Sequence, residues 1–147
     1  MARNRAKAKG RREKGSFASL PHSVLWSQEY AELSAIAVKL LVDLLGQYTG
    51  KNNGDLTATW KVMQRRGWKS KDTLYRALGE LQDTGFLIVA RQGGRNRCSL
   101  YALTFLAIDE CKGKTDIKPT ATPPGFWRSQ IKSCGPIIGA NCPGYRA

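Results

Sequence analysis

The sequence is short of acidic residues: 11 Asp and Glu stand against 24 Lys and Arg, and the 147 residues carry a formal net charge of +13. A chain this basic is expected to bind a polyanion, most often nucleic acid. It has no apolar run near the ~20 residues that cross a bilayer, and no hydrophobic segment follows its basic start, as a secretory signal requires. We therefore expect a cytoplasmic protein, associated with a bacterial nucleoid and not with a membrane.

Residues that carry chemistry are equally sparse. The one histidine, His22, follows Pro21, and no cysteine pair has the CxxC spacing of a zinc site. The cysteines are Cys98, Cys111, Cys134 and Cys142. Paired carboxylates, a nucleophile elbow and a phosphate-binding glycine loop are also missing. We expect no enzymatic activity, no cofactor and no metal, while pairing of Cys134 with Cys142 stays open.

Most of the excess charge lies at the two ends. Residues 1–16 carry seven Lys/Arg and one Glu, residues 17–110 carry eleven and nine acids, and residues 111–147 carry six and one Asp. The first segment has nothing to bury and is expected to be a disordered arm that can follow a DNA duplex. Residues 17–110 are expected to form one domain, and 111–147 a Pro/Gly-rich linker and tail. Docking on the domain, binding of a protein partner and disorder all stay open for the tail.

The first half of the expected domain contains two helical patterns. Pro21 suits the first position of a short helix. Ser34 is a suitable N-cap for a longer helix that extends to Tyr48, in which apolar residues recur at steps of three and four. The glycines and asparagines of "TGKNNGD" predict a loop, and a short extended piece is expected at Asp55–Leu56.

Two further helices follow, joined by a short connector. Thr57 is expected to cap the first, over Ala58–Arg66, and Ser70 the second, over Lys71–Thr84; a glycine follows each of them. The expected buried stripe of the second helix is Leu74, Ala77, Leu78 and Leu81. Helix, short glycine-containing turn and helix is the pattern of a helix-turn-helix.

The pattern then changes from helical to extended. "FLIVAR" and "CSLYALTFL" are rich in β-branched and aromatic residues. Between them, "QGGRNR" contains Gly93-Gly94, which permits a tight reversal. We expect a β-hairpin with a basic tip.

The stretch "SKDTLYRALGELQDTGFL", followed by "RQGGRNRCSLYALT", resembles the winged helix-turn-helix DNA-binding domains of plasmid and phage replication initiators and of small mobile-element proteins. The resemblance covers residues 17–110. It implies an α+β fold, with a three-helix core and a C-terminal β-hairpin wing. It also implies a sequence-specific protein that binds double-stranded DNA in transcriptional regulation or in the initiation or control of replication. Because winged helices also bind proteins, a module that acts on a host replication or defence protein is the alternative. A homodimer, and a protein partner bound through the tail, stay open.

One face of the last predicted helix is expected to meet DNA. With the apolar stripe inward, ~100° per residue places Asp72 and Arg76 furthest out. Arg76 suits guanine recognition, while Asp72 suits either a cytosine amino group or the positive end of the helix. The remaining basic residues suit phosphate contacts, although a polar face that is merely solvated is the alternative. The candidate DNA-binding residues are Lys61, Arg65, Arg66, Lys69, Ser70, Lys71, Asp72, Thr73, Tyr75, Arg76, Arg91, Arg95 and Arg97.

Overall fold

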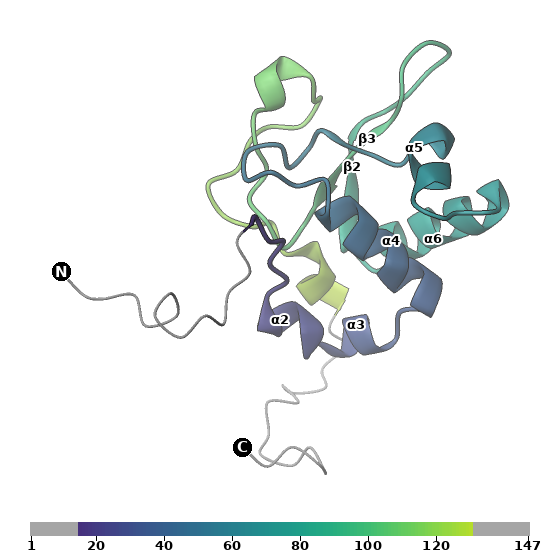
Figure 1. The fold of residues 1–147 in the computed structure, drawn as a ribbon. Coiled ribbons are helices and arrows are strands. Elements are labelled where there is room, and N and C mark those ends of the chain that lie inside the picture. Colours follow the sequence, from purple (N-terminus) through teal and green to yellow (C-terminus); the bar gives the residue numbers. More distant parts are fainter. Residues whose placement is uncertain (1–14, 131–147) are drawn as a thin grey trace, which may run out of the picture.

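The computed structural model describes residues 15–130, and in that part the chain has an α+β fold, as predicted (Figure 1). Its α-helices are α2 (His22–Leu25), α3 (Gln28–Ala31), α4 (Ala35–Leu45), α5 (Trp60–Arg65) and α6 (Lys71–Asp83). Its strands, β1 (Leu56–Thr57), β2 (Leu87–Arg91) and β3 (Leu100–Leu103), form an antiparallel sheet in the order β1-β3-β2. Two 3-10 helices follow, η1 (Cys111–Gly113) and η2 (Phe126–Gln130). The expected N-terminal arm lies almost wholly outside the described residues.

The two longest helices begin where the sequence predicts. Helix α6 ends within one residue of the predicted Thr84, but α4 ends at Leu45 and not at Tyr48 as expected. Ser34 and Ser70 are the N-caps of α4 and α6, and each hydroxyl accepts a hydrogen bond from the backbone N–H three residues further on, at 3.2 and 3.5 Å. Gly67 follows the C-cap of α5, and Gly85 that of α6, with φ of +87° and +80°. Residues with a side chain rarely adopt these angles, so α5 and α6 are each followed by a glycine.

The prediction that Thr57 caps α5 is wrong. Thr57 lies in β1, and Thr59 occupies the N-cap position without a side-chain cap bond. The side-chain amide of Gln47 holds Thr57 in the extended conformation: Gln47 Nε2 donates to the Thr57 carbonyl (2.9 Å), and the Thr57 N–H donates to Gln47 Oε1 (3.0 Å). A partner ten residues away therefore outweighs the local capping preference.

The hairpin forms as predicted, but its reversal is not at Gly93-Gly94. Gly94 and Arg97 pair across a two-residue turn, with their N–H groups donating to each other's carbonyls at 2.9 and 3.2 Å. The turn itself is Arg95-Asn96. Gly93 is needed for a different reason, since a Cβ there would lie 2.6 Å from the backbone nitrogen of Ser99. The tip consequently places an arginine, rather than a glycine, at the point of reversal.

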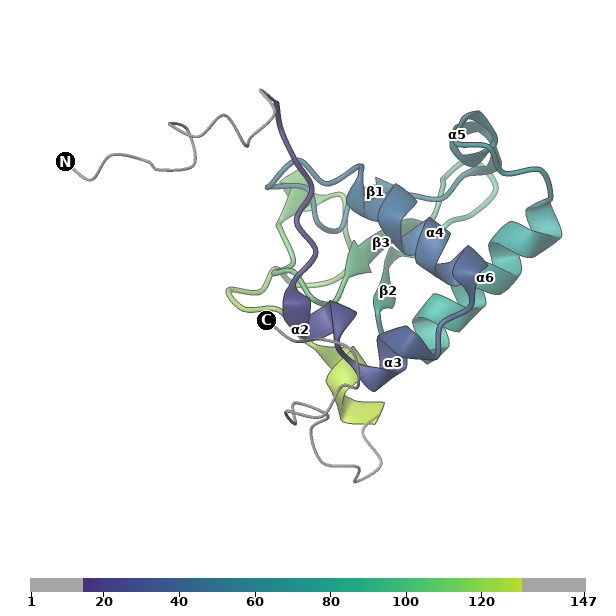
Figure 2. The same cartoon turned by 60° about the horizontal axis from the view of Figure 1, so that its bottom comes forward.

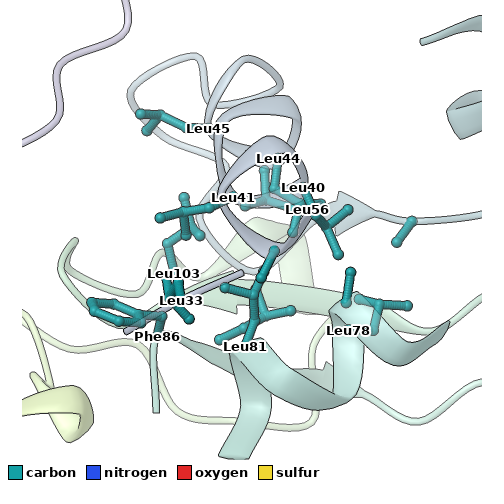
Figure 3. Packing of buried hydrophobic residues seen from close by; sticks show 14 of the residues in the cluster. Leu33, Leu40, Leu41, Leu44, Leu45, Leu56, Leu78, Leu81, Phe86 and Leu103 are labelled. Atoms are coloured by element: carbon teal, nitrogen blue, oxygen red, sulfur yellow. The ribbon is translucent and has the colours of Figure 1, made fainter. Parts of the chain in front are cut away.

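Helices α4 and α6 pack on one face of the sheet and supply a large part of the core (Figure 3). Leu40 and Leu44 of α4 meet Leu81 of α6, and all three side chains are fully buried. Burial of each such side chain is worth about 1.5–3 kcal/mol. A polar contact also joins the two helices, because the N–H and the hydroxyl of Ser34 both donate to the carboxylate of Glu80, each at 2.6 Å.

The opposite face of the sheet is covered by the chain that follows β3. A second apolar cluster forms there from Ala90, Leu100 and Ala102 of the sheet together with Ile108, and Ile117 packs against it. Backbone hydrogen bonds hold this cover in place: the N–H of residue 116 donates to the Ala90 carbonyl at 2.8 Å, and that of residue 120 to the Ile108 carbonyl at 2.9 Å. The sheet is therefore buried on both faces.

The chain then docks a second time, through η2. Trp127 is buried and stacks on Phe86, with ring centroids 5.6 Å apart and planes 15° apart. A Cβ at Gly85 would lie 2.9 Å from the backbone of Phe126 and Trp127, so this close approach requires a glycine. Of the three possibilities left open for the tail, docking applies to residues 111–130, and residues 131–147 lie outside the described part. The packed body thus extends beyond the expected domain 17–110.

Candidate nucleic-acid interface

Helix α5, the first turns of α6 and the tip of the β2–β3 hairpin lie at one end of the molecule. Both views show the tip beside α5, with α6 beginning just beyond it (Figures 1 and 2). Beside this surface, burial raises the pKa of Tyr101 in β3 above its ordinary value of 10.0; a hydrogen bond with Ser99 lowers it, and Tyr75 of α6 raises it by a smaller amount. The predicted surface is thus assembled from three separate parts of the chain, namely α5, the start of α6 and the hairpin tip at Gly94–Arg97.

Most of the predicted contact residues are open to solvent. Thr73 and Arg91 are half-buried. Tyr75 is 63% exposed, which leaves its ring available to a ligand rather than to the core. The exposed members are Lys61, Arg65, Arg66, Lys69, Ser70, Lys71, Asp72, Tyr75, Arg76, Arg95 and Arg97.

Two of the predicted arginines are held by other parts of the protein. The Arg66 guanidinium donates two hydrogen bonds to Oδ1 of Asp43, at 3.1 and 3.2 Å. Arg91 donates to the carbonyls of Cys98 (3.2 Å) and Lys114 (3.3 Å), and so ties the base of the hairpin to the segment that covers the sheet. We assign both arginines a structural role.

Asp43 is a functional residue of the fold that the sequence pattern did not single out. It is only 7% exposed and binds three donors. Besides Arg66, Lys39 Nζ donates to its Oδ2 at 2.7 Å and Trp68 Nε1 to the same oxygen at 2.9 Å. Burial alone would raise the pKa of Asp43, but these donors outweigh it and hold the pKa below its ordinary value of 3.8. The carboxylate thereby ties α4 to the connector between α5 and α6. Trp68 was the available signal, since a buried indole N–H needs an acceptor.

Other acids are likewise used inside the fold, away from α5 and the start of α6. Asp55 pairs with Lys114 at 2.6 Å, Glu80 binds Ser34, and Asp109 accepts from the N–H of Asn53 at 2.8 Å. These acids therefore do not neutralise the cations of α5 and the start of α6. Within residues 15–130, the following make no ion pair: Lys61, Arg65, Lys69, Lys71, Arg95 and Arg97.

A hollow of about 210 Å³ lies between α4 and the start of α6. Ile36 and Trp68 give it an apolar wall, and Lys69 and Ser70 lie where α6 begins. The first N–H groups of a helix attract anions, so this edge of the hollow suits a phosphate. The lining residues are Ile36, Lys39, Gly67, Trp68, Lys69, Ser70 and Thr73.

No family model, curated protein or solved structure matches the chain. Within the described part, no group of three or more His, Cys, Asp or Glu residues could hold a metal ion. None of the helices described there has both the length and the apolar character needed to cross a membrane.

Proposed function

We propose that this chain is a winged-helix protein that binds double-stranded DNA in a sequence-specific manner. The observation that carries the proposal is the group of cations without acidic partners that α5, the connector and the hairpin tip bring to one end of the molecule. The order of α4, β1, α5, α6, β2 and β3 along the chain is compatible with a helix-turn-helix followed by a wing. Such a surface matches the regular negative charge of a duplex.

In the proposed complex, α6 enters the major groove by its N-terminal half. Lys61, Arg65 and Lys69 contact phosphates on either side and fix the orientation of the protein without reading sequence. Arg95 and Arg97 contact the backbone or the minor groove next to the site. Arg66 and Arg91 make no DNA contact in the proposed complex, because their guanidinium groups are already bound within the protein.

The biological role that we propose is regulation of transcription, or an accessory part in the initiation or control of replication of a bacterial mobile element. This part of the proposal depends on the sequence resemblance of residues 17–110. If the protein binds no duplex, the alternative function is that of a module that binds a host protein through the same face.

Neutralising the proposed face is expected to weaken duplex binding and its salt dependence. In the variant Lys61→Ala/Arg65→Ala/Lys69→Ala, each lost phosphate contact should lower the slope of log K against log salt by about 0.9. The slope should therefore fall by about 2–3 for the triple variant. Fluorescence anisotropy with a labelled random-sequence duplex across a salt series measures it, with single-stranded DNA and RNA as competitors.

The matched control removes the same charge elsewhere. Lys51, Lys112 and Lys118 are exposed and lie outside α5, α6 and the hairpin. Their triple alanine variant should keep a slope close to that of the parent. Equal losses in the two variants would mean that net charge, rather than this face, binds DNA, and a parent that binds no duplex would refute the proposed function.

A further inference from the structure

Arg76 and Asp72 form an ion pair on the outer side of α6. Arg76 Nε lies 3.4 Å from Asp72 Oδ2, one helical turn away, and the two side chains are 74% and 83% exposed. Exposed pairs of this kind add little to stability. Asp72 is also the only acid on the outer side of the first two turns of α6, where every other charge is positive. An acid at this position weakens attraction to phosphate, so it calls for a different explanation.

The geometry of the guanidinium group explains why an acid is placed beside Arg76. Arginine presents its N–H groups in a fixed plane. When Nε faces a carboxylate, the two terminal nitrogens remain free to donate in parallel, and this matches O6 and N7 of guanine in the major groove. Within residues 15–130, the side chain of Arg76 makes no hydrogen bond, and its ion pair with Asp72 leaves both terminal nitrogens unoccupied. The pair therefore orients a donor fork that has no partner in the protein.

We propose that Asp72 is a positioning residue, which fixes Arg76 for guanine on the major-groove edge of the bound duplex. This inference rests on the proposed function and adds the class of base that is read. Asp72 favours selectivity at the expense of affinity: it restrains Arg76, and it repels phosphates and the acceptor edges of wrongly placed bases. The simpler alternative, a favourable charge in the first turn of a helix, affects folding but not the choice of base.

The test begins with selection of a site from a random duplex pool by the full-length chain. The selected duplex is then made with 7-deazaguanine, which lacks N7, or with inosine, which keeps O6 and N7 but lacks the minor-groove amino group. We expect 7-deazaguanine at one position to weaken binding about tenfold and inosine there to have little effect. In Arg76→Ala the sensitivity to 7-deazaguanine should disappear.

Asp72→Asn is the decisive variant. It should bind a scrambled duplex about two- to tenfold more tightly, since one repulsive charge is gone. Its loss of affinity on 7-deazaguanine should shrink from about tenfold to about twofold. Asp83→Asn is the control, because Asp83 is an exposed acid at the other end of α6 and its replacement changes the net charge equally. This control should keep the tenfold discrimination.

Three results would overturn the inference while leaving the proposed function intact. They are duplex binding without enrichment of any guanine-containing site, indifference of the parent to 7-deazaguanine, and full discrimination in Asp72→Asn. Failure of the parent to bind any duplex would instead overturn both. Thermal unfolding of each variant separates a loss of fold from a loss of recognition.

Discussion

Replacing Asp43 with alanine is expected to lower the free energy of unfolding by about 1–3 kcal/mol. The variant leaves Arg66 and Lys39 without their counter-charge and the buried Trp68 N–H without its acceptor. Arg66 and Lys39 are each about half exposed, at 54% and 47%, so water can recover part of their loss. The indole N–H of Trp68 cannot form a hydrogen bond with water instead, because Trp68 is only 5% exposed. Urea unfolding followed by circular dichroism measures the change.

Acid provides a second measurement of the same carboxylate. The folded pKa of Asp43 lies below its ordinary value of 3.8. The stabilisation is thus fully present above that value and is lost as the pH falls through the folded pKa. Asp43→Asn, which keeps the shape without the charge, should be less stable than the parent at neutral pH. The difference between the two should narrow below about pH 4; a difference that is constant with pH would show that the charge of Asp43 contributes nothing.

Replacing Asp43 with alanine should also disturb the proposed DNA-binding face. Asp43 holds the connector through Arg66 and Trp68, and that connector sets the position of α6 relative to α5. At a temperature where the variant remains folded, we expect weaker duplex binding than in the parent. Unchanged binding would mean that α6 keeps its position without this contact.

The parts of the fold that could be predicted are those with local causes. Helix α6 is an example: its N-cap Ser70, its apolar stripe and the glycine that follows it are all close in sequence. Periodicity and capping chemistry therefore place them correctly. The spacing of Asp72 and Arg76 is also local, because residues four apart in a helix are neighbours. Exposure of the candidate face follows from the same stripe.

The cover over the second face of the sheet could not be located in advance, although the sequence contained a signal for it. Leu87, Ile88, Val89 and Ala90 are apolar without alternation, which is typical of a strand buried on both faces rather than of a hairpin with one wet side. Nothing local identifies residues 108–120 as the cover. Its charged residues, threonines and single proline have the composition of a linker, and only tertiary packing places Ile117 against the sheet.

The division of the arginines into two groups has the same origin. The sequence alone does not distinguish Arg66 and Arg91, which are bound within the protein, from Arg65 and Arg95, which are not. The partner of Arg66 is 23 residues away, and Arg91 reaches a carbonyl at the same separation. Only the folded chain shows which charges are already bound and which remain for a ligand.

Replacing Trp127 with alanine should destabilise the protein by about 3–5 kcal/mol, as deletion of a buried aromatic side chain does. The ring is 4% exposed, its neighbour Phe86 is fully buried, and the guanidinium carbon of Arg128 lies 4.8 Å from the ring centroid. Unfolding in urea followed by circular dichroism is the suitable measurement, because the variant changes the tryptophan fluorescence itself.

Trp127→Phe is the matched variant, because it keeps an aromatic ring against Phe86 and should recover much of the loss. Helix η2 lies away from α5 and the hairpin tip in both views (Figures 1 and 2). Below its unfolding temperature, Trp127→Ala should consequently bind duplex DNA as the parent does, in contrast to Asp43→Ala. A midpoint equal to that of the parent would show that residues 123–130 do not dock in solution. Loss of DNA binding in a folded Trp127→Ala would show that the two ends of the molecule are coupled through Phe86 and α6.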